Sequence, residues 1–259
     1  MALVLGLLIV SFLLTAVLIV PFINLLYQLK FQRRRQKTKD PMEQPTPIYD
    51  RFHRSKTGTP VGGGLLVIVV TSILFSLILP LVKLLGVNVT SVFPLVDELN
   101  VLFFTFISFG LLGLYDDIMK FFGFEKTGFF GLRLRWKLGF QVVLAAISAI
   151  LMYVNLGIDI FYIPFIGVFH LGWWFVPAAA FIIVSFGNAV NISDGLDGLA
   201  AGLLMVAIFA LWVLSASILD TTLSMFLALW LGSTIAFLYF NVYPARIFLG
   251  DAAVVKKIA

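Results

Sequence analysis

The feature that most constrains this chain is a series of long apolar segments separated by short polar stretches. About 20 apolar residues cross the hydrocarbon core of a bilayer as a helix, and a spanning segment must satisfy its backbone polar groups within the protein. We therefore expect seven transmembrane helices: 3–26, 61–85, 100–115, 137–156, 173–187, 199–216 and 222–241. The apolar segment 158–167 is too short to cross and is expected to form a hairpin or a re-entrant piece. The predicted fold is an all-α, polytopic membrane protein.

The composition supports this class. Hydrophobic residues make up 61% of the 259 positions and charged residues only 12%, about half the charged fraction of a typical soluble domain. The chain has no cysteine, which excludes disulfides and thiolate metal sites. Basic residues follow the first apolar segment (Lys30 and Arg33–Arg35) and none precedes it, the reverse of a secretory signal peptide. We expect this segment to be retained as the first span.

The basic residues indicate which side of the membrane each connection faces. The connection 27–60 holds nine Lys and Arg, the connection 116–137 holds five and the C-terminal stretch holds three, so 17 of the 18 lie on one side of a seven-span topology. Only Lys83 falls on the other side. Because basic residues are enriched in cytoplasmic loops, we expect these regions in the cytoplasm and the N-terminus outside. Because the membrane topology already explains where the basic residues lie, we do not expect them to bind nucleic acid.

Two adjacent carboxylates, Asp116 and Asp117, end the third span on the expected cytoplasmic side. Ionisable residues next to hydrocarbon are costly and by default indicate function. Adjacent like charges repel and are stabilised by a cation, and hard oxygen ligands suit Mg²⁺ that is shared with substrate phosphates. The alternative is a solvated helix end at which both residues only cap a loop.

A second polar group lies between the fifth and sixth spans, in the stretch Asn188-Ala-Val-Asn191-Ile-Ser-Asp194-Gly-Leu-Asp197. Two amides and two carboxylates stand within ten residues, with no Lys or Arg among them. At the start of a helix Asp194 and Asp197, three residues apart, would share a face. The alternative, ordinary N-capping, explains one of these residues but not four.

Two further polar stretches fall on the same side. The stretch 241–251 follows the seventh span and combines Arg246 with a Gly-Asp pair, and Lys56 precedes a Gly-rich entry to the second span. The alternative for the stretch 241–251 is a juxtamembrane basic anchor with a turn, and the alternative for the stretch around Lys56 is a flexible loop at the entry to the membrane. Carboxylates that hold a metal, together with cations that meet phosphate, are typical of phosphoryl transfer at a membrane surface. A transporter would instead carry ionisable residues near the middle of its spans.

Five motifs occur in order between residues 53 and 251: SKTGTPVGGG, GLYDD, GLRLRWKLGFQ, NAVNISDGLDGLA and FLYFNVYPARIFLGD. In wording and order they resemble the polyprenyl-phosphate N-acetylhexosamine-1-phosphate transferases, and among these most closely the phospho-N-acetylmuramoyl-pentapeptide transferases. The resemblance implies a magnesium-dependent enzyme of peptidoglycan synthesis in the bacterial cytoplasmic (inner) membrane, with its active site on the cytoplasmic face. Such an enzyme transfers phospho-MurNAc-pentapeptide from UDP-MurNAc-pentapeptide to undecaprenyl phosphate, which gives lipid I and UMP.

The resemblance also implies roles for individual residues. The catalytic residues are expected to be Asp116, Asp117 and Asp251, with Mg²⁺ on Asp251 and Asp117. Substrate binding is expected at Lys56, Lys137, Asn188, Asn191, Asp194, Asp197, Asn241 and Phe248. Among these, Lys56 and Lys137 would lie near the nucleotide and the phosphates, and Phe248 would stack near the uracil. Members of the family often form dimers, so a homodimer is among the expected assemblies.

The sequence departs from the family at its end. It stops at Ala259, soon after Asp251, and its only histidines are His53 and His170, so the His-rich motif of a late cytoplasmic loop is missing. We therefore expect residues 1–259 to form a single membrane-embedded glycosyl-1-phosphate transferase domain, truncated at its C-terminus. Two alternatives stay open: the same transfer from UDP-GlcNAc or another UDP-N-acetylhexosamine, and a non-catalytic membrane remnant.

Overall fold

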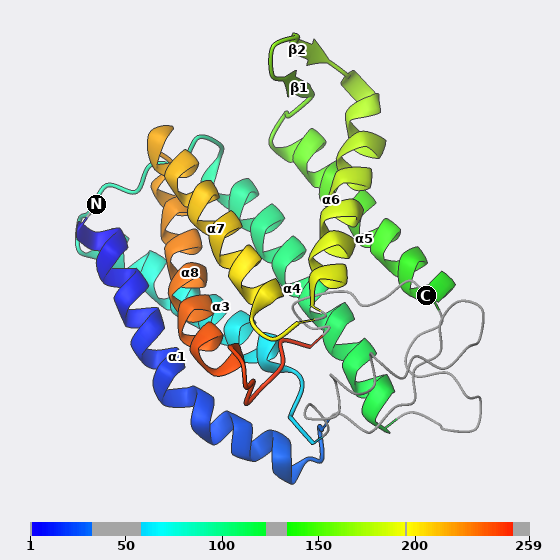
Figure 1. Cartoon of the computed structure of the whole chain (residues 1–259). Coiled ribbons are helices and arrows are strands. Elements are labelled where there is room, and N and C mark those ends of the chain that lie inside the picture. Colours follow the sequence, from blue (N-terminus) through cyan, green and yellow to red (C-terminus); the bar gives the residue numbers. More distant parts are fainter. Residues whose placement is uncertain (1, 33–57, 123–133, 195, 251–259) are drawn as a thin grey trace.

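A computed structural model describes residues 2–32, 58–122, 134–194 and 196–250, which form a helical bundle with one small hairpin (Figure 1). Its helices are α1 (Ala2–Gln28), α3 (Gly63–Leu84), α4 (Leu95–Phe122), α5 (Leu134–Asn155), α6 (Phe175–Ser193), α7 (Leu199–Ser217) and α8 (Thr221–Asn241). Between α5 and α6 lie strands β1 (Ile160–Ile163) and β2 (Gly167–His170) and the short 3-10 helix η3 (Gly172–Trp174). The described residues contain seven helices that are long and apolar enough to cross a membrane. The predicted all-α class and the seven spans are confirmed.

Two helices extend beyond their predicted spans. Helix α4 continues through Asp116 and Asp117 to Phe122, and it begins at Leu95, where acidic residues in its first turn suit the positive end of the helix dipole. Helix α6 continues to Ser193 and so includes the two asparagines of the second polar group. Each residue added to an existing helix gains one backbone hydrogen bond, so a helix does not end where its side chains become polar. The polar residues of these two groups therefore lie largely on helices.

The short apolar segment after α5 is an antiparallel hairpin, one of the two alternatives predicted for it. Ile160 pairs with His170, and Ile163 pairs with Gly167. The turn is closed by Ile166 N, which donates to Ile163 O at 3.1 Å. The hairpin stands at one end of the α5–α6 pair and does not re-enter the bundle (Figure 1).

Helix α8 is the centre of the bundle, because 67% of its span is buried, compared with at most 39% of any other span. It packs against α1, α3 and α7. Its contact with α1 is close, since a Cβ on Gly232 would lie 2.2 Å from both Leu8 O and Ser11 Oγ. One residue further, Ser233 accepts a hydrogen bond from Thr15 Oγ1 at 3.1 Å. Small residues and hydroxyl hydrogen bonds at a helix contact are typical of membrane bundles.

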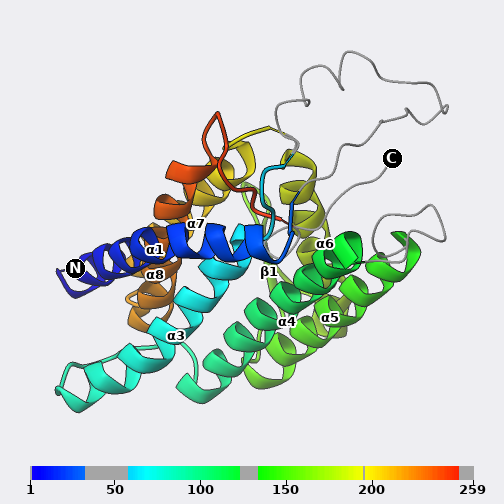
Figure 2. The same ribbon diagram turned by 90° about the horizontal axis from the view of Figure 1, so that it is seen from below.

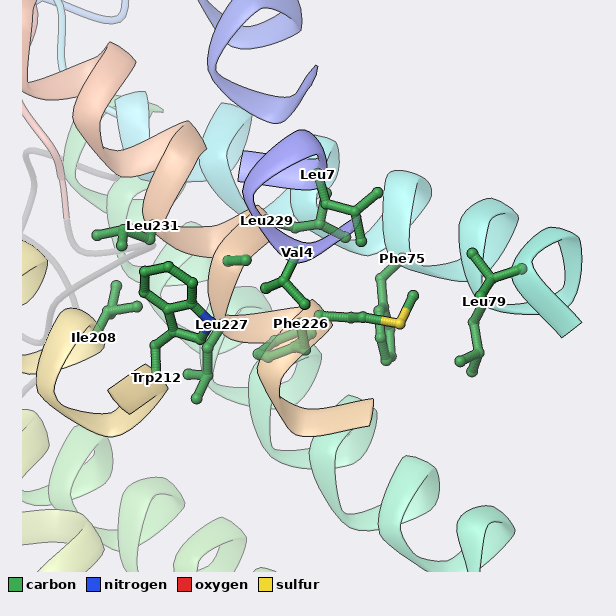
Figure 3. Close-up of a cluster of buried hydrophobic side chains, with 13 residues drawn as sticks. Val4, Leu7, Phe75, Leu79, Ile208, Trp212, Phe226, Leu227, Leu229 and Leu231 are labelled. Atoms are coloured by element: carbon green, nitrogen blue, oxygen red, sulfur yellow. The ribbon is translucent and has the colours of Figure 1, made fainter. Parts of the chain in front are cut away.

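Three hydrophobic clusters fill the bundle. One joins α1, α3, α7 and α8 and includes Phe75 and Phe226 (Figure 3). A second joins the same helices further along and includes Ile19 and Phe237. The third joins α5 to α6 through small residues such as Ala145. Seen from below, α4 and α5 lie side by side with α6 next to them, and α1 crosses the other part of the bundle (Figure 2). The α5–α6 pair thus has a core of its own.

Candidate active site

The predicted polar stretches meet at one end of the bundle, which we call the site end. It holds the C-terminal ends of α1, α4, α6 and α8 and the N-terminal ends of α3, α5 and α7 (Figure 1). Here Val61 N donates to Phe31 O at 3.0 Å, and Phe248 N donates to Pro60 O at 2.9 Å. Gly63 N in turn donates to Phe248 O at 2.9 Å. The stretch before α3 and the stretch after α8 are therefore joined through their backbones.

Gly250 brings the aspartate pair to the same place. It has a φ of +76°, and a Cβ built on it would lie 2.7 Å from Asp117 Oδ2 and 2.7 Å from Gly62 N. A glycine adopts this left-handed conformation without strain and lets a carboxylate approach the backbone. Asp117 itself is buried. Its carboxylate, on α4, thus lies against two loops that are distant in sequence.

Asp116, the other member of the pair, forms an ion pair with Lys137 of α5. The distance from Lys137 Nζ to Asp116 Oδ2 is 2.5 Å, and the side chains are only 3% and 2% exposed. Two charges removed from water require this mutual compensation. The resemblance implies that Lys137 lies near the nucleotide and the phosphates, and the structure adds that it contacts a catalytic candidate. The ion pair joins α4 to α5 at the site end.

Gln141 and Asn188 continue this polar line from α5 to α6. Gln141 lies one turn after Lys137 and is fully buried. Asn188 Nδ2 donates to Val184 O at 2.8 Å and, at a longer 3.4 Å, to Gln141 Oε1. Gln141 belongs to one of the five motifs, but no role was predicted for it. The signal that could have found it is its position four residues after Lys137, on the same face of an otherwise apolar helix.

Asn191, at the end of α6, is 2% exposed. Among the described residues its Oδ1 has no hydrogen-bond partner, although the atom is buried. Buried polar atoms without a partner are rare in proteins and call for an explanation such as an unseen ligand or water. The amide of Asn191 is therefore suited to contact a substrate.

Asp194 and Asp197 lie in the turn between α6 and α7. Asp194 is the C-cap of α6, and α7 begins only at Leu199. The prediction that the two aspartates share a face at a helix start is therefore wrong, because α6 continues to Ser193 and leaves both aspartates outside a helix. The N-capping alternative is also excluded, since the N-cap of α7 is Gly198, without a side-chain cap.

Asp197 and Asn241 fasten this turn to the segment after α8. Asp197 Oδ2 accepts a hydrogen bond from Ala245 N at 3.2 Å. Asn241 Oδ1 accepts one from Gly198 N at 3.2 Å, and its Nδ2 donates to Ile247 O at 2.8 Å. Both side chains were predicted to bind substrate, which stays a prediction, and these three hydrogen bonds join them to the protein backbone. They set the course of the chain that leads to Gly250.

Phe248 is buried next to the entry to α3. Two predicted site residues, Lys56 and Asp251, lie outside the described residues. Among the residues that the structure describes, no group of three or more His, Asp or Glu could hold a metal. Of the predicted magnesium pair, Asp117 is described, and it lies against the residue that directly precedes Asp251 in the sequence. The carboxylate of Asp117 is a hard oxygen donor of the kind that Mg²⁺ prefers.

Known proteins resemble the chain over most of its length. A sequence model of glycosyl transferase family 4 matches residues 99–254, which include the aspartate pair and the segment after α8. The phospho-N-acetylmuramoyl-pentapeptide-transferase of Clostridium perfringens is 32% identical over 244 residues, 94% of this chain and 67% of that protein. The enzyme of Desulforudis audaxviator is 35% identical over 255 residues, which are 93% of this chain and 69% of that protein. The enzyme of Desulfovibrio desulfuricans is 35% identical over 217 residues, which are 77% of this chain and 56% of that protein. The chain thus spans 56% to 69% of the length of these relatives.

Proposed function

The chain belongs to glycosyl transferase family 4 and, within it, to the phospho-N-acetylmuramoyl-pentapeptide transferases, and on this premise we propose that it transfers phospho-MurNAc-pentapeptide from UDP-MurNAc-pentapeptide to undecaprenyl phosphate. The products are lipid I, for peptidoglycan synthesis, and UMP. The observation that carries the proposal is the contact between the Asp117 carboxylate and Gly250, because it joins the aspartate pair to the Gly-Asp motif after α8. Separate stretches of a chain that meet in this way form a site.

The transfer exchanges one phosphorus–oxygen bond for another. An oxygen of the lipid phosphate attacks the phosphorus that carries the sugar, and the bond from that phosphorus to the bridging oxygen of the UDP diphosphate breaks. UMP leaves with the bridging oxygen. The attacking phosphate is largely ionised at neutral pH, so the protein needs little general-base power. Its main task is to hold two anionic substrates together and to stabilise the charge that develops on the leaving phosphate.

Asp117 and Asp251 are the residues we propose to hold Mg²⁺. When bound, the ion supplies Lewis-acid stabilisation to the phosphoryl oxygens. Lys137 holds Asp116 at 2.5 Å and so fixes the position of this carboxylate at the site end. In this arrangement Asp116 faces the lipid phosphate, and Lys137, together with Lys56, offsets negative charge from the substrates.

The donor nucleotide is proposed to bind next to the second polar group. The buried Oδ1 of Asn191 can accept a hydrogen bond from a base or ribose, and Asn188 and Asp194 lie on the same stretch of chain. Phe248 is the aromatic residue proposed to stack near the uracil. Asp197 and Asn241 act as positioning residues, because their hydrogen bonds fasten the α6–α7 turn to the segment that ends at Gly250.

The chain is a multi-pass bacterial membrane protein, with seven apolar helices and bacterial relatives. We propose that it lies in the cytoplasmic membrane with the site end in the cytoplasm, because 17 of its 18 basic residues belong to connections on that side. UDP-linked donors are cytoplasmic molecules, so this orientation gives the nucleotide direct access. A homodimer is part of the proposal and is tested by light scattering of the purified protein.

The test is UMP release by the purified 259-residue chain in detergent with undecaprenyl phosphate and Mg²⁺. UDP-MurNAc-pentapeptide and UDP-GlcNAc are compared as donors, and the lipid product is identified by mass spectrometry. The proposal expects UMP and lipid I from the muramoyl donor. Release with UDP-GlcNAc alone would replace the proposed donor, and no release from either donor by demonstrably folded protein would contradict the proposed activity of this chain.

A further inference from the structure

The β1–β2 hairpin has no part in the proposed reaction, and its composition is unusual for a loop in water. Residues 160–169 read IFYIPFIGVF and contain no charged side chain. Loops that project into solvent normally carry polar residues around their turns. At the tip Phe165 is fully exposed and Ile166 is 70% exposed. The least polar part of the loop is therefore the part furthest from the bundle.

Both faces of the hairpin are apolar. Residues paired across an antiparallel ladder share a face, so the register places Tyr162 and Val168 on one face and Phe161 and Phe169 on the other. Tyr162 is 65% and Val168 is 56% exposed, and Phe169 is 43% exposed on the opposite face. A hairpin that packs on one protein surface would need only one apolar face. A hairpin with two apolar faces and an apolar tip is instead suited to an environment that is apolar on all sides, such as lipid.

The backbone conformation at the tip indicates that the aromatic side chain of Phe165 is itself required. Phe165 has a φ of +67°, in the left-handed region that Gly or Asn adopts at less cost in a tight turn. An aromatic residue in this conformation is uncommon, and an observed outlier of this kind suggests a functional constraint. Among the residues that the structure describes, the ring has no compensating contact, because it is fully exposed. Its favourable contact must therefore lie outside the described chain.

The surroundings of the hairpin mark a membrane surface. Trp173 and Trp174, at its return to α6, are 69% and 76% exposed, and the ring of Trp173 packs at a tilt against Tyr153 of α5, with ring centroids 4.9 Å apart. Exposed Trp and Tyr at the ends of spans gather at the headgroup level of bilayers. The polar pair His170 and Asp159, 3.5 Å apart, stands at the base of the hairpin rather than at its tip.

The helices that carry the hairpin also expose apolar side chains on their outward faces. Val154 of α5 and Phe181 of α6 are 62% and 73% exposed, and both belong to the candidate spans. The bilayer covers such faces in a spanning helix. The hairpin stands at the end of these two helices and is likewise apolar and exposed, so the same lipid phase is the occupant that fits it.

We propose that the β1–β2 hairpin is an interfacial anchor whose tip, Phe165 and Ile166, inserts at the headgroup–acyl boundary of the leaflet opposite the site end. Interfacial amphipathic helices bury their apolar faces about 5–10 Å into that boundary, and we expect a similar depth for the hairpin tip. The anchored pair, α5 and α6, has its own hydrophobic core and carries Lys137 and Asn188 at its other end. The anchor therefore fixes the depth at which these two site residues stand in the membrane.

Single-cysteine labelling tests this directly, because the chain has no native cysteine. Phe165→Cys and, independently, Ile166→Cys are labelled with an environment-sensitive fluorophore and reconstituted into vesicles of phosphatidylethanolamine and phosphatidylglycerol. Both side chains are exposed, so neither substitution removes a packing contact. Asn88→Cys, in the exposed α3–α4 loop on the same side, is the aqueous control. Leu77→Cys, 64% exposed within α3, is the reference for the hydrocarbon interior.

The proposal expects blue-shifted emission from both tip labels. It also expects strong quenching by lipids spin-labelled at the headgroup or upper acyl chain, and weak quenching by aqueous iodide. Emission and iodide access equal to those of the Asn88→Cys control would overturn it. Blue-shifted emission that lipid quenchers leave unchanged, and that varies with the protein-to-lipid ratio, would overturn it in favour of a second copy of the chain. Quenching as deep as at Leu77→Cys would contradict the interfacial depth.

Discussion

Replacing Gly250 by alanine is expected to disable the site more than it destabilises the fold. Alanine in the left-handed region costs about 1–2 kcal/mol. Its Cβ would also lie 2.7 Å from Asp117 Oδ2 and from Gly62 N, so these groups must move by about 0.7 Å to reach the 3.4 Å of an ordinary contact. Misplacement by about 1 Å in a catalytic centre lowers rates roughly 100-fold. We therefore expect Gly250→Ala to lower the rate of UMP release by roughly 10- to 100-fold.

Gly86 provides a matched control for this substitution. Its φ is +75°, nearly that of Gly250, but a Cβ on it would meet nothing within 4 Å, and it lies in the α3–α4 loop away from the site end. Gly86→Ala therefore carries the same backbone strain without the displacement of Asp117. UMP release per folded protein and the melting temperature are measured for both variants. Equal rates of UMP release for the two variants would refute the reasoning, because strain alone would then account for the effect.

Three further substitutions test the packing and the loop connections. Gly232→Ala introduces a clash with α1 and should lower the free energy of unfolding by about 1–3 kcal/mol, whereas Gly6→Ala, which has open space around it, should not lower the melting temperature. Asn241→Ala removes the hydrogen-bond partner of two backbone groups, which costs about 1–3 kcal/mol for each group that stays buried. This variant should have lower stability and a lower rate of UMP release, whereas Asn241→Asp should keep part of the stability and part of the rate. Asp220→Ala removes the N-cap of α8, at about 0.5–2 kcal/mol, and should lower the melting temperature without changing the rate of UMP release, because this cap lies away from the site end; an equal loss of rate would contradict that separation.

The spans could be predicted from the sequence because each needs only a local property, about 20 apolar residues in a row. The ends of α4 and α6 could not, since hydropathy records where apolar side chains stop and not where backbone hydrogen bonding stops. Asp116 and Asp117 thus emerged as part of a helix. The position of Gly232 against Leu8 likewise depends on a contact between the first and last helices, which no local pattern contains.

The composition of the site was visible in the sequence, but its connections were not. The pairing of Lys137 with Asp116 and the meeting of Gly250 with Asp117 join residues from separate helices and loops, so they depend on tertiary packing. Asn241 illustrates the difference: its predicted role as a substrate ligand follows from residue type, whereas its hydrogen bonds with Gly198 N and Ile247 O depend on the fold. A polar side chain at the end of a span can serve a ligand or a buried loop equally well.

The role of Asp117 in phosphotransfer is decided by the Mg²⁺ dependence of UMP release by Asp117→Asn, measured beside wild type and Asp97→Asn. Asp97 lies on the same helix, α4, but in its first turn, so the control makes the same chemical change at the opposite end. We predict that Asp117→Asn abolishes release or sharply raises its Mg²⁺ requirement, while Asp97→Asn behaves as wild type. Wild-type rate and Mg²⁺ dependence in a folded Asp117→Asn variant would contradict a phosphotransfer site built around this carboxylate.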